Sequence, residues 1–583
     1  MSAKGEKRGQ WGSRLGFILA EAGSAVGLGN IWKFPYVAGE NGGGLFVLLY
    51  LVCVAFVGLP IMMAEIMIGR AAQKQPVVAF EELQGKRTGW SALGWLGIIA
   101  GFIIMSYYVV VCGWVLDYTL KSVIHFTAPI EEAAATEARS FRASASLDQM
   151  KTLLVQRTVD RETNDQVADI RGEAKKRIWK SHDSFKTAWQ AAGSTDEARD
   201  NLLSDPDLAA AVARAESLEG RITEVKAVAA ERARAHYEGL PEAEIRSEAE
   251  TEQRRSIIKE KVKATFLGVA TDGWLTTFWS ALFMALTIMV VAAGISGGIE
   301  RWCKVLMPLL FITILVMVVY GMFTPGFEKA ISFVFKPDPS KLKASGVLEA
   351  LGQAFFSLSL GMGAMITYGS YQRRKSGLAR QSAMIAGLDT AVALLACMMM
   401  FPIIFTYGEQ PSAGPGLVFM SMPLAFAEIG KGGQLLSIIF FGLLVFAALT
   451  SLISLLEVVS SYFIDKKGWS RRRAAWSIGG VTMAFAIPSA FAMDDGGLFK
   501  SWEPGYGKNF FDTVDYLAAN WMLPVGGMLI SIYAGWVMPK RLRAAELSGV
   551  PTVVAKVWLW AVRVLAPVLV ALVLAHKAGF IDL

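Results

Sequence analysis

Two apolar stretches of the chain are interrupted by small and polar residues whose backbone could bind an ion or a charged ligand. The first reads GSAVGLGNIWKFP from Gly23 to Pro35, with glycines at positions 23, 27 and 29 and Asn30 beside them. The second reads FFSLSLGMG from Phe355 to Gly363. Such residues favour unwound backbone, which exposes carbonyl oxygens to a cation and amide hydrogens to a carboxylate. Close packing of helices on small residues would account for either segment alone.

The elements that position these segments are predicted to be membrane-spanning helices. The chain has 583 residues, of which 54% are hydrophobic and 18% charged, and its mean hydropathy is +0.42. A soluble domain has about 25% charged residues, so this composition excludes an ordinary soluble enzyme. Eleven apolar stretches are each long enough to cross a bilayer, which takes about 20 residues of helix. They cover residues 13–38, 43–69, 90–124, 272–294, 302–323, 346–372, 379–406, 434–464, 471–493, 513–537 and 553–577.

The two interrupted segments are the first and sixth of these spans. They therefore hold corresponding positions in two halves of five spans each. Paired interruptions of this kind predict a binding site between inverted repeats, near the middle of the membrane.

Residues 127–268 are a different kind of polypeptide, rich in Ala, Glu, Arg and Lys and poor in aromatic residues. This composition is typical of surface-exposed helices. Asp205-Pro206 and Gly239-Leu240-Pro241 predict helix boundaries, because proline suits the first turn of a helix and glycine suits its end. We therefore expect a membrane domain, formed by residues 1–126 and 269–583, that is interrupted by a soluble helical insert.

Basic residues fall on alternate short loops, which predicts that these loops and the amino terminus are cytoplasmic. The insert and the carboxyl terminus are then extracytoplasmic. Lysines between Lys329 and Lys343 go against this orientation, but five cationic loops outweigh one. The cationic loops are Arg70–Arg87, Arg301–Lys304, Arg373–Arg380, Lys466–Arg473 and Lys540–Arg543. The sequence Ala20-Glu21-Ala22 after a basic start imitates a signal peptide, but the interrupted apolar part favours a membrane span.

Several of these segments resemble the neurotransmitter:sodium symporter family, whose members have the leucine-transporter fold. The resemblance rests on Gly23–Pro35, on ENGGGLFVLLY (Glu40–Tyr50), on GQAFFSLSLGMGAMITYGSY (Gly352–Tyr371) and on AALTSLISLLE (Ala447–Glu457). It covers nearly everything outside residues 127–268 and is closest to the bacterial members with eleven spans.

The resemblance implies an all-α polytopic membrane protein of the bacterial inner membrane. Its eleven transmembrane helices would form a 5+5 inverted repeat with helices 1 and 6 broken, and the soluble insert would lie between helices 3 and 4. The implied activity is sodium-coupled symport of a small amino acid or amine by alternating access.

Two sodium ions are implied by the same resemblance, and both would bind at the helix breaks. The first site would comprise the Ala25 carbonyl with Asn30, Ser357 and Asp389, joined by the carboxylate of the substrate. The second site would comprise the carbonyls of Gly23, Val26 and Ala447 with the hydroxyls of Thr450 and Ser451. Without the resemblance, Thr450 and Ser451 would be an ordinary polar pair between helices.

The organic substrate is expected between the same breaks. Its carboxylate would bind the amides of Leu28 and Gly29 and the Tyr108 hydroxyl. Its ammonium group would bind the carbonyls of Ala25, Phe356 and Ser357 and the Ser359 hydroxyl. Its side chain would face Ser24, Ile104, Phe356, Met362, Ser451 and Leu455. This lining has no formal charge, so a neutral, hydrophobic or aromatic amino acid is favoured. Gly27 supports an amino acid, because relatives that carry amines have an aspartate there.

Two acidic residues depart from the family pattern. Asp389 stands where many relatives have asparagine, and Ala393 stands where chloride-dependent relatives have serine. A permanent carboxylate could replace the charge of chloride, so we expect chloride-independent transport, although Tyr50, Gln353 and Ser357 match the rest of a halide site. Asp389 could instead be a buried, partly protonated acid. Glu21, in the inner half of the first span, could face the inner vestibule or take part in proton antiport.

Gates on both sides of the site are implied by position. Outside, Lys33 and Asp515 would pair above Tyr108 and Phe356, with lysine replacing an arginine and losing bidentate geometry. Inside, Arg8, Trp11, Tyr371 and Asp465 match the residues that close the cytoplasmic path. Glu65 and Glu457 are expected to be interior polar partners of the broken helices.

Other classes of protein fit the sequence less well. The chain has no P-loop, HExxH or GxSxG motif and its histidines are dispersed, so we predict no catalytic residues. The alternative function is a membrane sensor or binding protein that detects an amino acid while the insert engages a partner. The mixed charge of the insert argues against nucleic acid, and a protein partner or self-association stays open.

Overall fold

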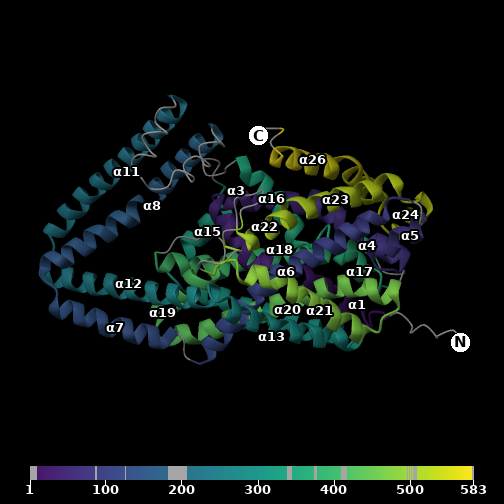
Figure 1. Cartoon of the computed structure of the whole chain (residues 1–583), viewed down its shortest axis with the longest axis horizontal. Helices are drawn as coiled ribbons and strands as arrows, with labels where there is room; N and C mark the ends of the chain where they lie inside the picture. The colour runs from purple at the N-terminus through teal and green to yellow at the C-terminus, as the bar shows by residue number, and fades with distance from the viewer. Residues whose placement is uncertain are drawn as a thin grey trace. The chain divides into compact units, whose positions relative to one another are not determined.

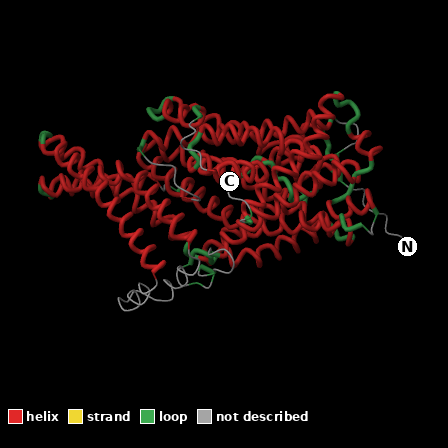
Figure 2. The backbone as a smooth tube through the Cα atoms, turned by 90° about the horizontal axis from the view of Figure 1, so that it is seen from above, coloured by secondary structure: helices red, strands yellow, loops and turns green. Residues whose placement is uncertain are grey.

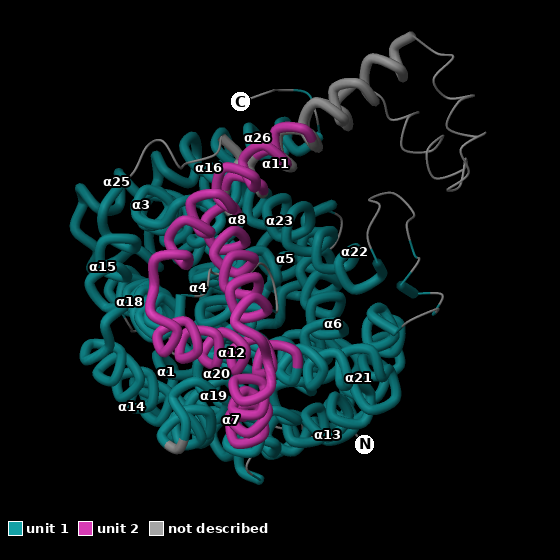
Figure 3. The backbone as a smooth tube through the Cα atoms, turned by 90° about the vertical axis from the view of Figure 1, so that its left-hand side faces the viewer, with its two compact units in different colours: residues 1–130, 261–583 teal, residues 131–260 magenta. Residues whose placement is uncertain are grey.

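The computed structural model describes residues 9–85, 88–124, 127–181, 206–337, 344–372, 377–408, 416–494, 497, 499–500, 502, 509–578 and 580. Every regular element in this described part is helical (Figures 1 and 2). The chain divides into two compact units, one of residues 1–130 and 261–583 and one of residues 131–260 (Figure 3).

In the larger unit, eight helical stretches are long and apolar enough to cross a membrane. Several contain a short π-helical segment, written η, between α-helical parts. The eight are Gly44–Ala72 (α3, η2 and α4), Ser91–Val123 (α6), Gly273–Ala292 (α13), Ile295–Met322 (η3 and α14), Leu378–Thr406 (α18), Gly432–Lys467 (most of α20, Lys431–Lys467), Phe510–Val537 (α22, η6, α23 and η7) and Thr552–Lys577 (α25, η8 and α26).

A ninth span is formed if a bent pair is counted as one. Helix α1 (Arg14–Ala25) and the helical stretch Gly29–Glu40, which comprises η1 (Gly29–Lys33) and α2 (Phe34–Glu40), meet at an angle of 48°. The first predicted interruption is therefore present as a break in the helix.

Two of the eleven predicted spans are not among the helices that are long and apolar enough to cross a membrane. The sixth is split into α16 (Ala344–Ser357) and α17 (Ala364–Gly369), and each piece is too short to cross a bilayer alone. The ninth is α21 (Arg471–Ala490), which begins with three consecutive arginines. The count of eleven therefore stays a prediction, while nine spans are supported by length and composition in the described residues.

The broken helices are held by long, continuous neighbours. Helix α1 packs against α14, α18 and α20, and α17 packs against α4. Helices α6, α20 and α21 run beside one another (Figure 1). Shorter helices complete the unit, and they are α5 (Pro76–Gln84), α15 (Phe327–Phe335), η5 (Leu417–Ser421), α19 (Met422–Ile429) and α24 (Lys540–Glu546).

Four long helices enter or form the smaller unit. They are α7 (Thr127–Ser144), α8 (Leu147–Ser181), α11 (Pro206–Glu238) and α12 (Glu242–Ala270). Helices α8 and α11 are antiparallel, because Met150 and Leu154 pack with Tyr237 while Val167 and Ile170 pack with Ile222. The start of α11 and the interval between α11 and α12 fall where proline and glycine predicted helix boundaries.

Candidate functional site

At the break of the first span, the glycines lie where a side chain has no room. Helix α1 ends at Ala25, and Val26 has extended backbone with φ −73° and ψ 95°. A Cβ atom on Gly27 would lie 2.2 Å from the Ser451 hydroxyl oxygen, so a larger residue would collide with α20. The Leu28 amide donates to the Tyr108 hydroxyl oxygen at 3.1 Å. The break therefore turns a backbone donor toward a side chain of α6.

The sixth span breaks over Leu358–Gly363, between α16 and α17. Ser359, Gly361 and Gly363 have left-handed backbone, with φ of 53°, 81° and 76°. Such backbone suits glycine but costs a serine about 1–3 kcal/mol. The Ser359 hydroxyl offsets part of this cost by donating to the Ser24 carbonyl oxygen at 2.9 Å. This hydrogen bond joins the two breaks directly.

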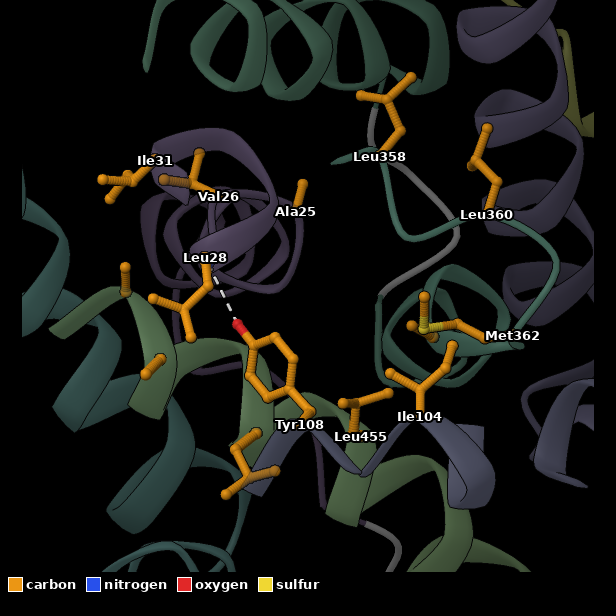
Figure 4. Close-up of a cluster of buried hydrophobic side chains, with 14 of the residues drawn as sticks. Ala25, Val26, Leu28, Ile31, Ile104, Tyr108, Leu358, Leu360, Met362 and Leu455 are labelled. Carbon is orange, nitrogen blue, oxygen red and sulfur yellow. Dashed lines mark hydrogen bonds between the residues drawn. The ribbon is translucent and has the colours of Figure 1, made fainter. Parts of the chain in front are cut away.

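A cavity of about 30 Å³ lies between the breaks, and none of the described residues that line it has a charged side chain. Ile104, Leu455 and Met362 surround it, and the Tyr108 hydroxyl points toward the Leu28 backbone (Figure 4). A space of this volume holds a water molecule or two, so an amino acid can enter only if the walls separate. The lining residues are Ser24, Gly27, Gly29, Ile104, Tyr108, Phe356, Ser359, Met362, Ser451, Ser454 and Leu455.

Most of the residues predicted to bind the organic substrate line this cavity. The exceptions are Ala25 and Ser357, at the ends of the helices that precede the breaks, and Leu28, which contributes its amide to Tyr108. Ser454 was not predicted. Its place three residues after Ser451 could have revealed it, because residues three apart share one face of a helix.

Three of the four residues predicted for the first sodium site belong to one buried hydrogen-bonded group. The Asn30 amide nitrogen donates to a carboxylate oxygen of Asp389 at 2.7 Å. The Tyr50 hydroxyl lies 3.2 Å from the other carboxylate oxygen and 3.0 Å from the Ser357 hydroxyl. The fourth residue, Ala25, is the last residue of α1. Tyr50 thus bridges Asp389 and Ser357, which lie on different helices.

The residues predicted for the second sodium site lie where α1 meets α20. A Cβ atom on Gly23 would be 3.1 Å from the Cβ atom of Thr450, so the glycine lets the two helices approach. The Thr450 hydroxyl donates to the Ala447 carbonyl oxygen at 3.1 Å. Val26 lies in the extended backbone after α1, and Ser451 lines the cavity. This arrangement offers carbonyl and hydroxyl oxygens, the donors that a hard cation prefers.

The ion pair predicted for the outer gate is present. The Lys33 ammonium lies 3.6 Å from an Asp515 carboxylate oxygen and 4.4 Å from the centre of the Phe356 ring. Both charged side chains are partly exposed, so the pair itself contributes little stability, about 0–1 kcal/mol. The pair holds the Lys33 ammonium group above the Phe356 ring, which lines the cavity.

Of the residues predicted for the inner gate, Trp11 and Tyr371 are in contact. The Trp11 amide donates to the Tyr371 carbonyl oxygen at 3.3 Å, and the Trp11 indole donates to the Tyr368 carbonyl oxygen at 3.0 Å. Arg8 lies outside the described residues. Asp465 accepts from the Gln75 amide at 3.1 Å, which anchors the loop before α5.

Near Trp11 and Tyr371, Glu457, which was expected to be an interior polar partner, and Glu300, which was not singled out, form specific contacts. Glu457 accepts from the Tyr371 hydroxyl at 2.6 Å and pairs with Arg471. Glu300 accepts from the Gly12 amide at 2.6 Å and from the Ser13 hydroxyl at 2.8 Å. Glu457 thus binds Tyr371, and Glu300 binds the residues that follow Trp11, so both partners of the Trp11–Tyr371 contact are held in place.

Glu21 and Glu65 are both fully buried. Glu65 accepts from the Gly361 amide at 2.7 Å, so it supports the break between α16 and α17. Neither carboxylate oxygen of Glu21 has a hydrogen-bond partner among the described residues. In this conformation Glu21 faces protein rather than a water-filled vestibule.

The chain is similar to known proteins over most of its length. The model of the sodium:neurotransmitter symporter family matches residues 8–166 and 243–580. A Bacillus subtilis (strain 168) protein named "Uncharacterized sodium-dependent transporter YhdH" is 28% identical, over 99% of this chain and 99% of its own. Sodium-dependent nutrient amino acid transporter 1 of Drosophila simulans is 25% identical, over 80% of this chain and 64% of its own.

A solved structure is similar over nearly the whole chain. The crystal structure of MhsT in complex with L-phenylalanine superimposes with a TM-score of 0.71 at 34% sequence identity, over 98% of this chain and 100% of that chain. This family and fold are those of sodium-coupled transporters rather than enzymes, and the apolar helices are those of a membrane-embedded protein. The chain belongs to the sodium:neurotransmitter symporter family.

Proposed function

We propose that this protein is a sodium-coupled symporter that imports a neutral, hydrophobic or aromatic amino acid by alternating access. The observation that carries the proposal is the cavity between the two helix breaks, whose walls combine hydroxyl groups with apolar side chains and carry no ionised group. A charged side chain would lose its hydration there without a compensating partner. The L-phenylalanine bound by the similar transporter MhsT supports the same substrate class.

The two ends of the amino acid have different partners at the breaks. The carboxylate binds the amides of Leu28 and Gly29 and the Tyr108 hydroxyl, where a helix begins and its dipole favours negative charge. The ammonium group binds the Ser359 hydroxyl and the carbonyl oxygens of Ala25, Phe356 and Ser357. Gly27 leaves the site without a fixed acid, so an amine without a carboxylate is a poor substrate.

Two sodium ions accompany the substrate in this proposal. The first binds among Ala25, Asn30, Ser357 and Asp389 and contacts the carboxylate of the amino acid. The second binds among Gly23, Val26, Ala447, Thr450 and Ser451. Because the first ion and the amino acid share a contact, each raises the affinity for the other by the same factor.

Transport is independent of chloride in this proposal. Asp389 is buried and hydrogen-bonded to Asn30 and Tyr50, which supports a carboxylate as the local negative charge. Ala393 supplies no hydroxyl to a halide. The role of Glu21 stays open between the inner pathway and proton antiport.

The outer and inner contacts alternate during transport. The Lys33–Asp515 pair and the Phe356 ring close the outer path, whereas Trp11 and Tyr371, with Arg8 and Asp465, close the inner path. The membrane domain has eleven helices in a 5+5 inverted repeat. The amino terminus is cytoplasmic, and the insert and the carboxyl terminus are on the outer side of the bacterial inner membrane.

Uptake by proteoliposomes tests the proposal. Labelled leucine or phenylalanine should accumulate when sodium is outside and not when potassium replaces it. Unlabelled aromatic amino acids should compete, dopamine should not, and gluconate in place of chloride should leave uptake unchanged. Sodium-dependent binding without accumulation would instead favour the sensor, the second function that the sequence allows.

A further inference from the structure

The smaller unit contains a cavity of about 450 Å³ between α8 and α11. Pockets of about 300–1,000 Å³ are typical of small-molecule sites. Val155 and Val159 of α8 face Ala227 and Ala230 of α11 across it. The two alanines leave the space open, because leucine at the same positions would fill it. An apolar body of a ligand can therefore lie between these two helices.

Three cations line the cavity, against one acid. They are Lys151 of α8 and Lys226 and Arg234 of α11, and the acid is Glu238. Other arginines of this unit are paired with glutamates, for example Arg142 with Glu250 and Arg161 with Glu252. The three cations that line the cavity have no such partner among the described residues. Their charge is available to a ligand.

Tyr237, which also lines the cavity, carries a neutral polar group. Tyr237 is buried, and its hydroxyl lies 3.1 Å from the Thr158 hydroxyl. Burial raises the pKa of the Tyr237 phenol above its usual value, so the group stays protonated and uncharged at neutral pH. Tyr237 therefore adds no charge of its own to the cavity.

We propose that this cavity binds a small organic carboxylate with an apolar body. The carboxylate pairs with Arg234, whose planar guanidinium can donate two parallel hydrogen bonds, and Lys226 adds a second positive charge. The apolar body lies on the valines and alanines. All of α11 lies in residues 167–242, which the family model does not match, so this site is additional to the transport site.

The test is calorimetric titration of the full chain in detergent with 2-naphthaleneacetate, using protein-free micelles as the blank. The neutral analogue 2-naphthaleneacetamide should bind at least about tenfold more weakly, because it loses the charge-assisted hydrogen bonds. The Lys226→Ala/Arg234→Ala variant should weaken binding of the carboxylate by a similar factor. The matched control is Arg232→Ala, an exposed arginine on α11 outside the cavity, which should change affinity less than about twofold.

A second pair of variants tests the shape of the cavity without changing charge. Ala230→Leu should fill the hollow and weaken binding at least about tenfold, whereas Ala235→Leu, at an exposed position outside it, should not. Circular dichroism and thermal melting of each variant report whether α8 and α11 stay folded. Equal binding of carboxylate and amide, equal binding by all variants, or no binding at millimolar probe would each overturn the proposal.

Discussion

The Asn30 amide nitrogen lies 2.7 Å from a carboxylate oxygen of Asp389, and both side chains are fully buried. The contact joins the break in the first span to the continuous helix α18. Tyr50 extends the group to Ser357 at the end of α16. The Asp389 carboxyl group thus connects Asn30 in the first broken span, through Tyr50, with Ser357 beside the second break, where the proposed function places a sodium ion.

Variants at Asp389 and Tyr50 should distinguish the effect of the Asp389 charge on sodium binding from the effect of its hydrogen bonds. Asp389→Asn keeps an oxygen acceptor for Asn30 but removes the negative charge. We expect the sodium concentration for half-maximal uptake to rise about tenfold, because ligand charge sets the affinity for hard cations. Sodium titrations of uptake in proteoliposomes measure it. The control is Tyr50→Phe, which removes a hydrogen bond but keeps the charge and should have the smaller effect.

A methyl group at position 27 should stop transport without unfolding the protein. The Cβ atom of Gly27→Ala would lie 2.2 Å from the Ser451 hydroxyl oxygen and 3.0 Å from the Tyr108 hydroxyl oxygen. The break must shift, and we expect uptake to fall at least about tenfold, since small displacements of binding groups cost that much or more. Gly480→Ala, where a Cβ atom meets open space, should leave uptake unchanged. Full activity of Gly27→Ala would show that the observed break is not the transporting conformation.

Removal of the Trp11 side chain should open the inner path. Trp11 bonds to Tyr368 and Tyr371, and the neighbouring Gly12 amide bonds to Glu300, one turn before Cys303. Cys303 is buried, so its alkylation by a maleimide reports opening. In a background with the other cysteines replaced, we expect Trp11→Ala to speed alkylation about tenfold, the result of shifting the equilibrium by about 1.4 kcal/mol. Trp476→Ala, at an exposed tryptophan, should not speed it.

Removing one partner of the Glu457–Arg471 ion pair should destabilise the protein more than removing both. Glu457 is fully buried, so Glu457→Leu leaves Arg471 without its counter-charge and should lower the free energy of unfolding by about 3 kcal/mol. The double variant Glu457→Leu/Arg471→Met should recover much of this loss, because no unpaired charge remains. Denaturant titration in detergent provides the comparison. A double variant less stable than the sum of the single variants would contradict this account.

The sequence predicted the helix breaks, which depend on residues that are close together along the chain. Gly27, Ser359 and Gly361 interrupt apolar runs, and the corresponding positions of these interruptions in the first and sixth spans favoured helix breaks over close packing. The cluster at Asn30, Ser357 and Asp389 and the lining of the cavity followed from the resemblance to a known family, and the structure brings most of these residues together.

Contacts between distant segments could not be read from the sequence. Glu300 binds Gly12, and Glu457 binds Tyr371 and Arg471, but each partner is identified only when the helices are packed. The cavity of the insert depends on which faces of α8 and α11 meet. The predicted number of spans exceeds the number that length and apolarity support by two, because the sixth span divides into two short pieces and the ninth begins with three arginines.

The most direct test of the central claim, that one site between the broken helices binds an amino acid together with sodium, is reciprocal binding. Equilibrium binding of labelled L-phenylalanine or L-leucine to the purified protein would be measured across sodium concentrations at constant ionic strength. Sodium binding would then be measured with and without the amino acid. We predict that each ligand raises the affinity for the other by the same factor, and that Asp389→Asn reduces this factor. Amino-acid affinity that is unchanged when potassium replaces sodium would contradict the account.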